Sequence, residues 1–155
     1  TCAIRNPAMI TEIASQYGSQ SLIASIDVKK NLFGKYTVRS GSGKKDAKLD
    51  PISWAKKVES LGAGEILLTS IDKEGSWEGF DLELVKSVSE AVGIPVIANG
   101  GAGNIDHIAR AVNQGGASAV ALGSMVTFQK KGMGVLVSFP NSSELEEALS
   151  DRASI

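Results

Sequence analysis

The chain of 155 residues is long enough to bury one hydrophobic core and to form a single domain. A net charge of −1 gives no electrostatic reason to expect a nucleic acid or an anionic membrane as partner, and no apolar run approaches the roughly 20 residues that span a bilayer. Cys2 is the only cysteine, which excludes an intrachain disulfide and a cysteine-rich zinc site. We therefore expect a cytoplasmic protein with neither a membrane nor a nucleic acid as partner.

The chain opens on a predicted helix. Asn6 is a typical helix cap, Pro7 suits the first helical position, and apolar residues then recur at helical spacing as far as Gly18. Because Thr1 is not a methionine and the first clear element is already a helix, we expect the sequence to be a piece cut from inside a larger domain.

Four short apolar runs follow and alternate with helices. We predict strands at residues 21–27, 64–71, 95–98 and 117–122, and helices at residues 50–61, 81–88, 105–112 and 143–149. Strands that are apolar throughout are typical of a parallel sheet that is buried on both faces. One helix followed by four strand–helix units indicates either half of a (β/α)8 barrel, whose complete form has roughly 250 residues, or a small open α/β sheet.

One long irregular segment interrupts this alternation at residues 28–48. Residues 33–35 can turn a small hairpin between Leu32 and Val38, and residues 40–45 have the composition of a flexible loop. Long loops inside compact domains are usually functional lids or disordered. The position of this segment after the first strand favours a lid.

Polar residues and glycines gather at the carboxyl ends of all four predicted strands. They are Asp27, residues 72–75, residues 99–103, and Gly123 with Ser124. In parallel α/β folds this rim is where active sites form, because the loops there face one common space.

The glycines of this rim predict an anion site. Residues 100–103 precede a helix, so their backbone N–H groups and the positive helix end can hold a phosphate, and Gly123 with Ser124 adds further donors. Asp106 stands where a dinucleotide fingerprint would need its third glycine, which argues against that cofactor. The alternative is that these glycines serve simple turns.

Three single residues are weaker candidates. Asp27 ends an apolar strand and can serve as a general acid or base, or instead cap a helix or pair with the lysines that follow it. His107, the only histidine, is expected to be a surface residue, and no catalytic triad or metal cluster can be assembled from it. Trp77 lies in a loop and is placed to pack or to line a pocket.

Specific strings resemble the cyclase subunit of imidazole glycerol phosphate synthase. They are residues 62–72 (GAGEILLTSID) and 98–103 (ANGGAG), with shorter matches at residues 6–7, 17–20 and 26–27. The resemblance runs from residue 1 to about residue 124 and covers the second half of that family's barrel. It implies that residues 1–155 form a single half-barrel domain, with parallel strands five to eight of a TIM barrel and without the N-terminal half.

The resemblance also implies an activity. The family is a lyase of histidine biosynthesis that binds a bis-phosphate ribulosyl-imidazolecarboxamide substrate across the barrel mouth. It takes ammonia from a glutamine amidotransferase (glutaminase) partner and closes an imidazole ring, with no cofactor or metal. Asp27 matches one of its two acid/base aspartates, and the other belongs to a strand that this chain lacks. Glu65, at the opposite end of its strand, matches one member of the charged gate through which ammonia enters.

The remaining site positions are likewise implied by the resemblance. Thr1 matches a position at the phosphate site of the first half barrel. The other phosphate- and substrate-binding positions are Thr69, Glu74, Gly75, Gly101, Gly123 and Ser124.

Two departures from the family leave an alternative open. Glu74 stands where the family usually has aspartate, and the added methylene pushes the carboxylate outward. The tail at residues 125–140 is more similar to paralogues associated with surface-polysaccharide synthesis. Those proteins are thought to partner a glutaminase and to channel ammonia for sugar amidation. A phosphosugar-binding fragment without catalysis is a third possibility.

A half barrel would have an unusual surface. Its sheet has two unpaired edges and one concave face of apolar side chains, and both features favour association. We expect the isolated chain to form a homo-oligomer, most simply a dimer that completes a barrel, and to be inactive or weakly active.

Overall fold

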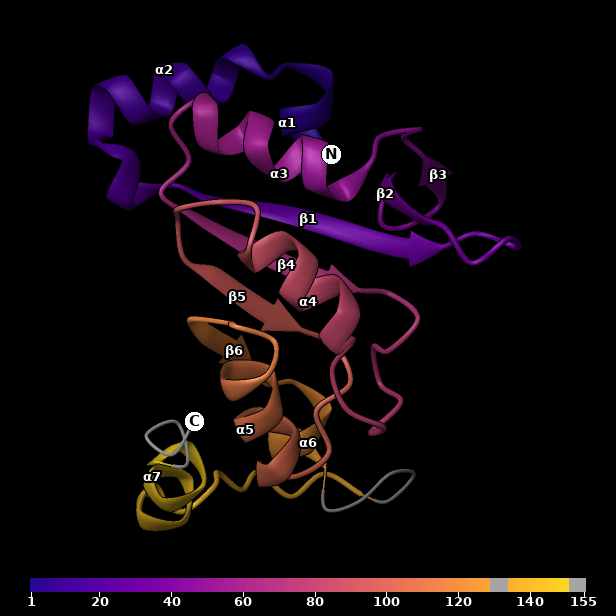
Figure 1. Ribbon diagram of the computed structural model, residues 1–155, viewed down its shortest axis with the longest axis vertical. Coiled ribbons are helices and arrows are strands. Elements are labelled where there is room, and N and C mark those ends of the chain that lie inside the picture. The colour runs from indigo at the N-terminus through magenta and orange to yellow at the C-terminus, as the bar shows by residue number, and fades with distance from the viewer. Residues whose placement is uncertain (129–133, 151–155) are drawn as a thin grey trace.

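The computed structural model describes residues 1–128 and 134–150, which are built around one six-stranded sheet with the order β3-β2-β1-β4-β5-β6 (Figure 1). β1 (Ile23–Lys30), β4 (Glu65–Ser70), β5 (Val96–Asn99) and β6 (Ala119–Ala121) are parallel, and each pairs with the next one along the chain. All four predicted strands are therefore present. Parallel strands in chain order lack the switch point of a doubly wound sheet, and this order is the one found in a (β/α) barrel.

Three helices join the parallel strands. α3 (Pro51–Ser60) precedes β4, α4 (Leu82–Ser89) precedes β5, and α5 (Ile105–Asn113) precedes β6. They are capped by Asp50, Asp81 and Asn104, each of which accepts the backbone N–H of the third residue after it. The remaining helices are α1 (Cys2–Arg5), α2 (Ala8–Tyr17), the single 3-10 turn η1 (Ser19–Ser21), α6 (Ser124–Thr127) and α7 (Ser142–Ser150).

The core lies on one face of the sheet. Alternate strand residues such as Ile26, Leu68 and Ala98 are at most 1% exposed and belong to one cluster with the apolar faces of α3 and α4. The strand residues between them are only partly buried or are exposed, and Ile23 is 52% exposed. The expectation that both faces of the strands are buried is therefore wrong for this chain, because the described helices cover one face and leave the other open.

The segment after β1 forms the predicted hairpin and extends further than predicted. β2 (Tyr36–Ser40) runs antiparallel to β1, and β3 (Lys45–Asp46) pairs with β2 where only a flexible loop was expected. The Asn31 side chain closes the turn by accepting the N–H of residues 33 and 35 at 2.9 and 3.0 Å. β2 meets β1 only from Asp27 onward, so the edge expected to be unpaired is half covered.

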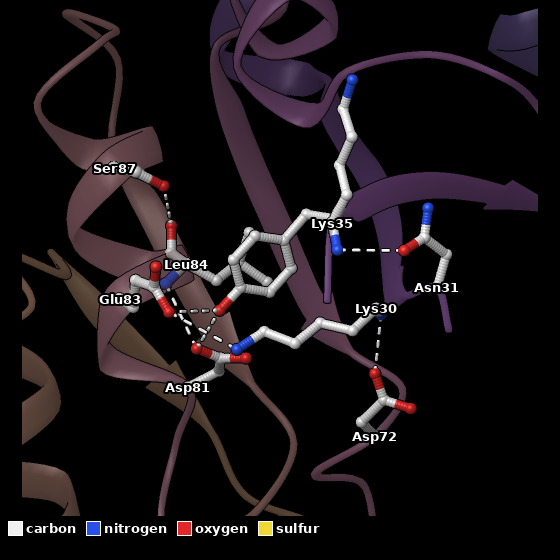
Figure 2. Close-up of polar contacts among 9 residues, drawn as sticks. Lys30, Asn31, Lys35, Asp72, Asp81, Glu83, Leu84 and Ser87 are labelled. Atoms are coloured by element: carbon white, nitrogen blue, oxygen red, sulfur yellow. Dashed lines mark hydrogen bonds and ion pairs between the residues drawn. The ribbon is translucent and has the colours of Figure 1, made fainter. Parts of the chain in front are cut away.

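A polar cluster fastens this hairpin to the start of α4 (Figure 2). The Tyr36 hydroxyl donates to Asp81 Oδ1 at 2.7 Å and lies 3.2 Å from Glu83 Oε2. Lys30 Nζ lies 3.4 Å from the same Glu83 oxygen, and the Lys30 N–H donates to Asp72 Oδ2 at 2.8 Å. Burial, followed by the hydrogen bond to Asp81, raises the pKa of Tyr36 well above its usual range.

The cluster predicts a pH-dependent contribution of the Tyr36 hydroxyl to stability. Tyr36→Phe should lower the free energy of unfolding by about 1 kcal/mol at neutral pH, because Asp81 loses one of its two donors and keeps only the Leu84 N–H. The folded-state pKa is raised, so this contribution is complete below the unfolded-state pKa of about 10 and is lost as pH rises above it. Urea unfolding of both proteins from pH 7 to 11 measures the difference, with exposed Tyr17→Phe as control. A difference that stays constant to pH 11 contradicts the assignment.

Candidate active site

A row of side chains crosses the open face near the carboxyl ends of the strands. The register places Asp27 of β1 beside Thr69 of β4, Thr69 beside Asn99 of β5, and Asn99 beside Ala121 of β6. The Asn99 amide donates to Thr69 Oγ1 at 3.1 Å and joins the centre of the row. The register thus brings Asp27 and Thr69 together. Asn99, which sequence analysis grouped only with the glycine loop, adds a third side chain to this row.

Asp27 is held in a strand, not at a helix end. It is partly buried, and within residues 1–128 and 134–150 no hydrogen bond or ion pair is found for its carboxylate. Lys30 pairs with Glu83 instead, so the cap and lysine-pair alternatives do not describe this residue. The neighbouring Arg39 is engaged by Asp46 at 3.6 Å and by carbonyl oxygens of its own loop. The Asp27 carboxylate therefore faces the open side with its acceptor oxygens unused.

A small pocket lies at the tips of β5 and β6. Three loops form it, namely those that follow β4, β5 and β6. Its lining residues are Glu74, Gly75, Asn99, Gly100, Gly101, Ala102, Ala121, Gly123 and Ser124. The structure therefore brings together five of the predicted phosphate- and substrate-binding residues, and Asn99 connects this pocket to the row that begins at Asp27.

Glycine is required in this pocket for packing as well as for any ligand. Gly101 has a φ of +105°, and a Cβ atom there would collide with the carbonyl oxygen of Gly79 in the loop after β4. The Gly79 N–H donates to the Gly101 carbonyl at 2.8 Å, so the two loops lie backbone to backbone. Gly101 thus has a packing role between two loops, which differs from the simple turns that were the alternative to an anion site, and the same contact helps to form the pocket.

His107 has a role that sequence analysis missed. Its Nδ1 accepts the Gly103 N–H at 3.2 Å, and its ring also packs close to Gly79. The partly buried ring therefore bridges the loops after β4 and β5, where a lone surface histidine was expected. The only signal in the sequence was its place in the first helical turn after a glycine-rich loop.

Two predicted residues lie outside both the row and the pocket. The Thr1 hydroxyl accepts the Gly41 N–H at 2.8 Å, beside the hairpin and on the far side of the sheet order from β6. Glu65 begins β4, at the opposite end of that strand from Thr69, and lies beside Ile23. The structure therefore places both residues away from the glycine pocket.

The end of the described chain packs beside the pocket. Trp77 lines a groove together with Gly103 and Ile105 and with the tail, as its loop position allowed. Phe128 pairs with Val135, and residues 129–132 of the divergent tail lie outside the described residues.

Within residues 1–128 and 134–150, no three His, Cys, Asp or Glu side chains converge to hold a metal ion. None of the helices described is both long enough and apolar enough to cross a membrane.

The arrangement suits acid/base chemistry on a phosphorylated ligand. Neighbouring strands are about 4.8 Å apart, so Asp27 lies roughly 10 Å from Asn99 and the pocket. A ligand with its phosphate in the pocket and an extended chain along the row would place a reactive atom near Asp27. Parallel strands in chain order, with glycine loops after the last two and an acid within an earlier one, define a protein of the (β/α)-barrel class.

The chain belongs to the histidine biosynthesis protein family, whose model matches residues 1–131. This is a TIM-barrel family, and the chain covers part of that barrel. The chain is 47% identical over 129 residues to imidazole glycerol phosphate synthase subunit HisF of Chlorobaculum tepidum, a match that covers 83% of the chain and 51% of the relative. The HisF subunit of Alkaliphilus metalliredigens is 44% identical over 128 residues (83% and 51%), and that of Prochlorococcus marinus is 47% identical over 126 residues (80% and 49%). The chain spans about half the length of the curated relatives it matches.

The contact between the two loops predicts unequal effects of alanine at two glycines of positive φ. Gly34 (φ +76°) has open space around it, so Gly34→Ala should cost about 1 kcal/mol of unfolding free energy from backbone strain alone. Gly101→Ala should cost about 3 kcal/mol or more, because the loops must also separate. Urea unfolding of both variants measures the difference. Equal losses would show that the loops are not packed as described.

Proposed function

We propose that this chain is the second half of a cyclase subunit of imidazole glycerol phosphate synthase, a lyase of histidine biosynthesis that works in the cytoplasm. The observation that carries the proposal is the row from Asp27 to the glycine pocket on one open face. The relatives named as this subunit, at 44–47% identity, support the same assignment.

The proposed roles follow from where the residues lie. Gly101, Gly123 and Ser124 bind one phosphate of a bis-phosphate ribulosyl-imidazolecarboxamide substrate through backbone N–H groups and a hydroxyl. Asp27 moves a proton at the reacting end of the substrate, which lies along Thr69 and Asn99. We place the second phosphate beside Thr1 and the second catalytic aspartate outside this chain.

The opposite end of the strands is proposed as the ammonia entrance. Glu65 lies there, one full strand length away from Thr69. A glutamine amidotransferase bound at that end would release ammonia into the barrel, on the side away from the phosphate pocket. Glu65 would then be part of the charged gate.

A change at Asp27 tests the catalytic role. In the full-length protein, with ammonia supplied directly, Asp27→Asn should lower turnover by about 10²- to 10⁴-fold and leave substrate affinity within a few-fold, because the amide keeps its size and loses its proton-accepting charge. Glu12→Gln, which removes an exposed carboxylate on α2, serves as control and should retain turnover. Full activity of Asp27→Asn excludes Asp27 as acid or base.

One observation favours the second candidate, a HisF-like barrel that channels ammonia for sugar amidation. Glu74 lies inside the pocket where the cyclase binds a phosphate. The same assay separates the candidates, since the unmodified full-length protein would then show no cyclase activity with ammonia.

We also propose that residues 1–155 are one half-barrel domain whose open face is covered by another four-stranded half. In the chain by itself, only a second copy can supply that half. Leu67 and Ile97 lie on this face, and no described strand pairs with the outer edge of β6. Covering them would bury apolar surface and pair free backbone groups.

Self-association of the isolated chain is the test of this proposal. Size-exclusion chromatography with light scattering should show a dimer or larger oligomer of residues 1–155. Leu67→Lys should shift the population toward monomer by placing a charge on the open face, whereas Leu32→Lys, at the exposed hairpin tip, should leave it unchanged. A monodisperse monomer of the unmodified chain would contradict the proposal.

A further inference from the structure

The turn after β4 directs Glu74 over the tip of β5. β4 ends at Ser70, whose carbonyl oxygen accepts the N–H groups of Lys73 and Glu74 at 3.2 and 3.1 Å. Gly75 follows with a φ of +69° and lets the chain turn away. This tight turn brings the Glu74 side chain back toward the loops that form the glycine pocket.

Both carboxylate oxygens of Glu74 face the pocket. A Cβ atom placed on Gly100 would lie 3.4 Å from Glu74 Oε2, and one placed on Gly123 would lie 3.9 Å from Glu74 Oε1. The carboxylate therefore lies between the loops after β5 and β6, where a bound phosphate would be. No hydrogen bond from another described residue fixes its oxygens there, so they remain ready to accept a donor from a ligand.

Glu74 also sets the charge of the pocket. Of the nine described residues that line it, Glu74 is the one with a charged side chain. Lys73, the adjacent cation, pairs with Glu78 at 3.5 Å. The attraction that the pocket offers to an anion therefore comes from backbone N–H groups and the Ser124 hydroxyl, and it is opposed by one negative charge at close range.

We propose that Glu74 is a specificity-determining residue. It disfavours an alkyl phosphate without hydroxyls and favours a phosphate ester whose chain carries a hydroxyl next to the phosphate. Such a hydroxyl donates to the Glu74 carboxylate, and a hydrogen bond to an ionised acceptor is among the stronger ones in proteins. The dianion of an alkyl phosphate has no proton to donate and meets only the repulsion. This inference rests on the proposed phosphate site in the glycine pocket and adds the class of phosphate compound that the site accepts.

Two probes test this preference at pH 8, where a phosphate monoester is mainly dianionic. They are propyl phosphate, whose dianion has no proton to donate, and glycerol 3-phosphate, which has the same carbon chain with hydroxyls added. Calorimetric titration of the full-length protein should give roughly tenfold tighter binding of glycerol 3-phosphate than of propyl phosphate. Glu74→Gln should strengthen the binding of propyl phosphate roughly tenfold and reduce the preference to about twofold.

The control removes a carboxylate from the same loop but outside the pocket. Glu78→Gln eliminates one negative charge near Lys73 and should leave the preference unchanged. Glu74→Asp, which withdraws the carboxylate by one methylene, should move the preference in the same direction as Glu74→Gln by a smaller factor. Thermal unfolding of each variant shows that it is folded.

The outcomes distinguish the inference from the proposed function. If both probes bind and Ser124→Ala weakens their binding, but Glu74→Gln leaves the preference intact, then Glu74 has no discriminating role and the phosphate site stands. If neither probe binds to the unmodified protein or to either variant, Glu74→Gln or Glu78→Gln, then the phosphate site and the role of Glu74 are both wrong.

Discussion

The backbone of Gly101 lies against the backbone of Gly79 at a separation that no side chain permits, and the rim of the sheet depends on that contact. The contact holds the loop after β4 against the loop after β5, and His107 supports both through Gly103 and Gly79. The pocket exists because these loops are locked together before any ligand arrives. Preorganised N–H donors are effective for anions since no rearrangement is needed on binding.

Local patterns were sufficient for the elements and for the rim. Asp50 and Asp81 cap the predicted helices, and the polar residues at the strand ends meet on one side because parallel strands in chain order must end together. Asp27, Thr69 and the glycine loops meet on one side because side chains alternate along each strand and the register aligns neighbouring strands. These features depend on residues that are close in sequence or fixed by the parallel order.

The features that sequence analysis missed depend on contacts that a local pattern does not report. The Tyr36 hydroxyl bonds to Asp81, 45 residues away, and fastens the predicted hairpin, which covers half of an edge expected to be unpaired. His107 was interpreted as a surface residue because a helical pattern does not report a side chain that folds back onto Gly103 and Gly79. The strand pattern predicted burial on both faces, since an apolar strand has the same composition whether one or both of its faces are covered, and only the half-barrel interpretation implied an open face.

The open face carries a charge arrangement whose strength depends on what covers it. Asp27 stands at one end of the row and Glu74 in the pocket beyond its other end, and Arg39, which pairs with Asp27 across β1 and β2, is engaged by Asp46. With water over the face, the repulsion between these carboxylates and a bound phosphate is screened. Closing the face with another half barrel would remove that water and lower the effective dielectric, which strengthens every interaction of charges inside. An anionic ligand would then bind only by bringing hydrogen-bond donors to the carboxylates. The same closure that completes a barrel would therefore sharpen its choice of ligand.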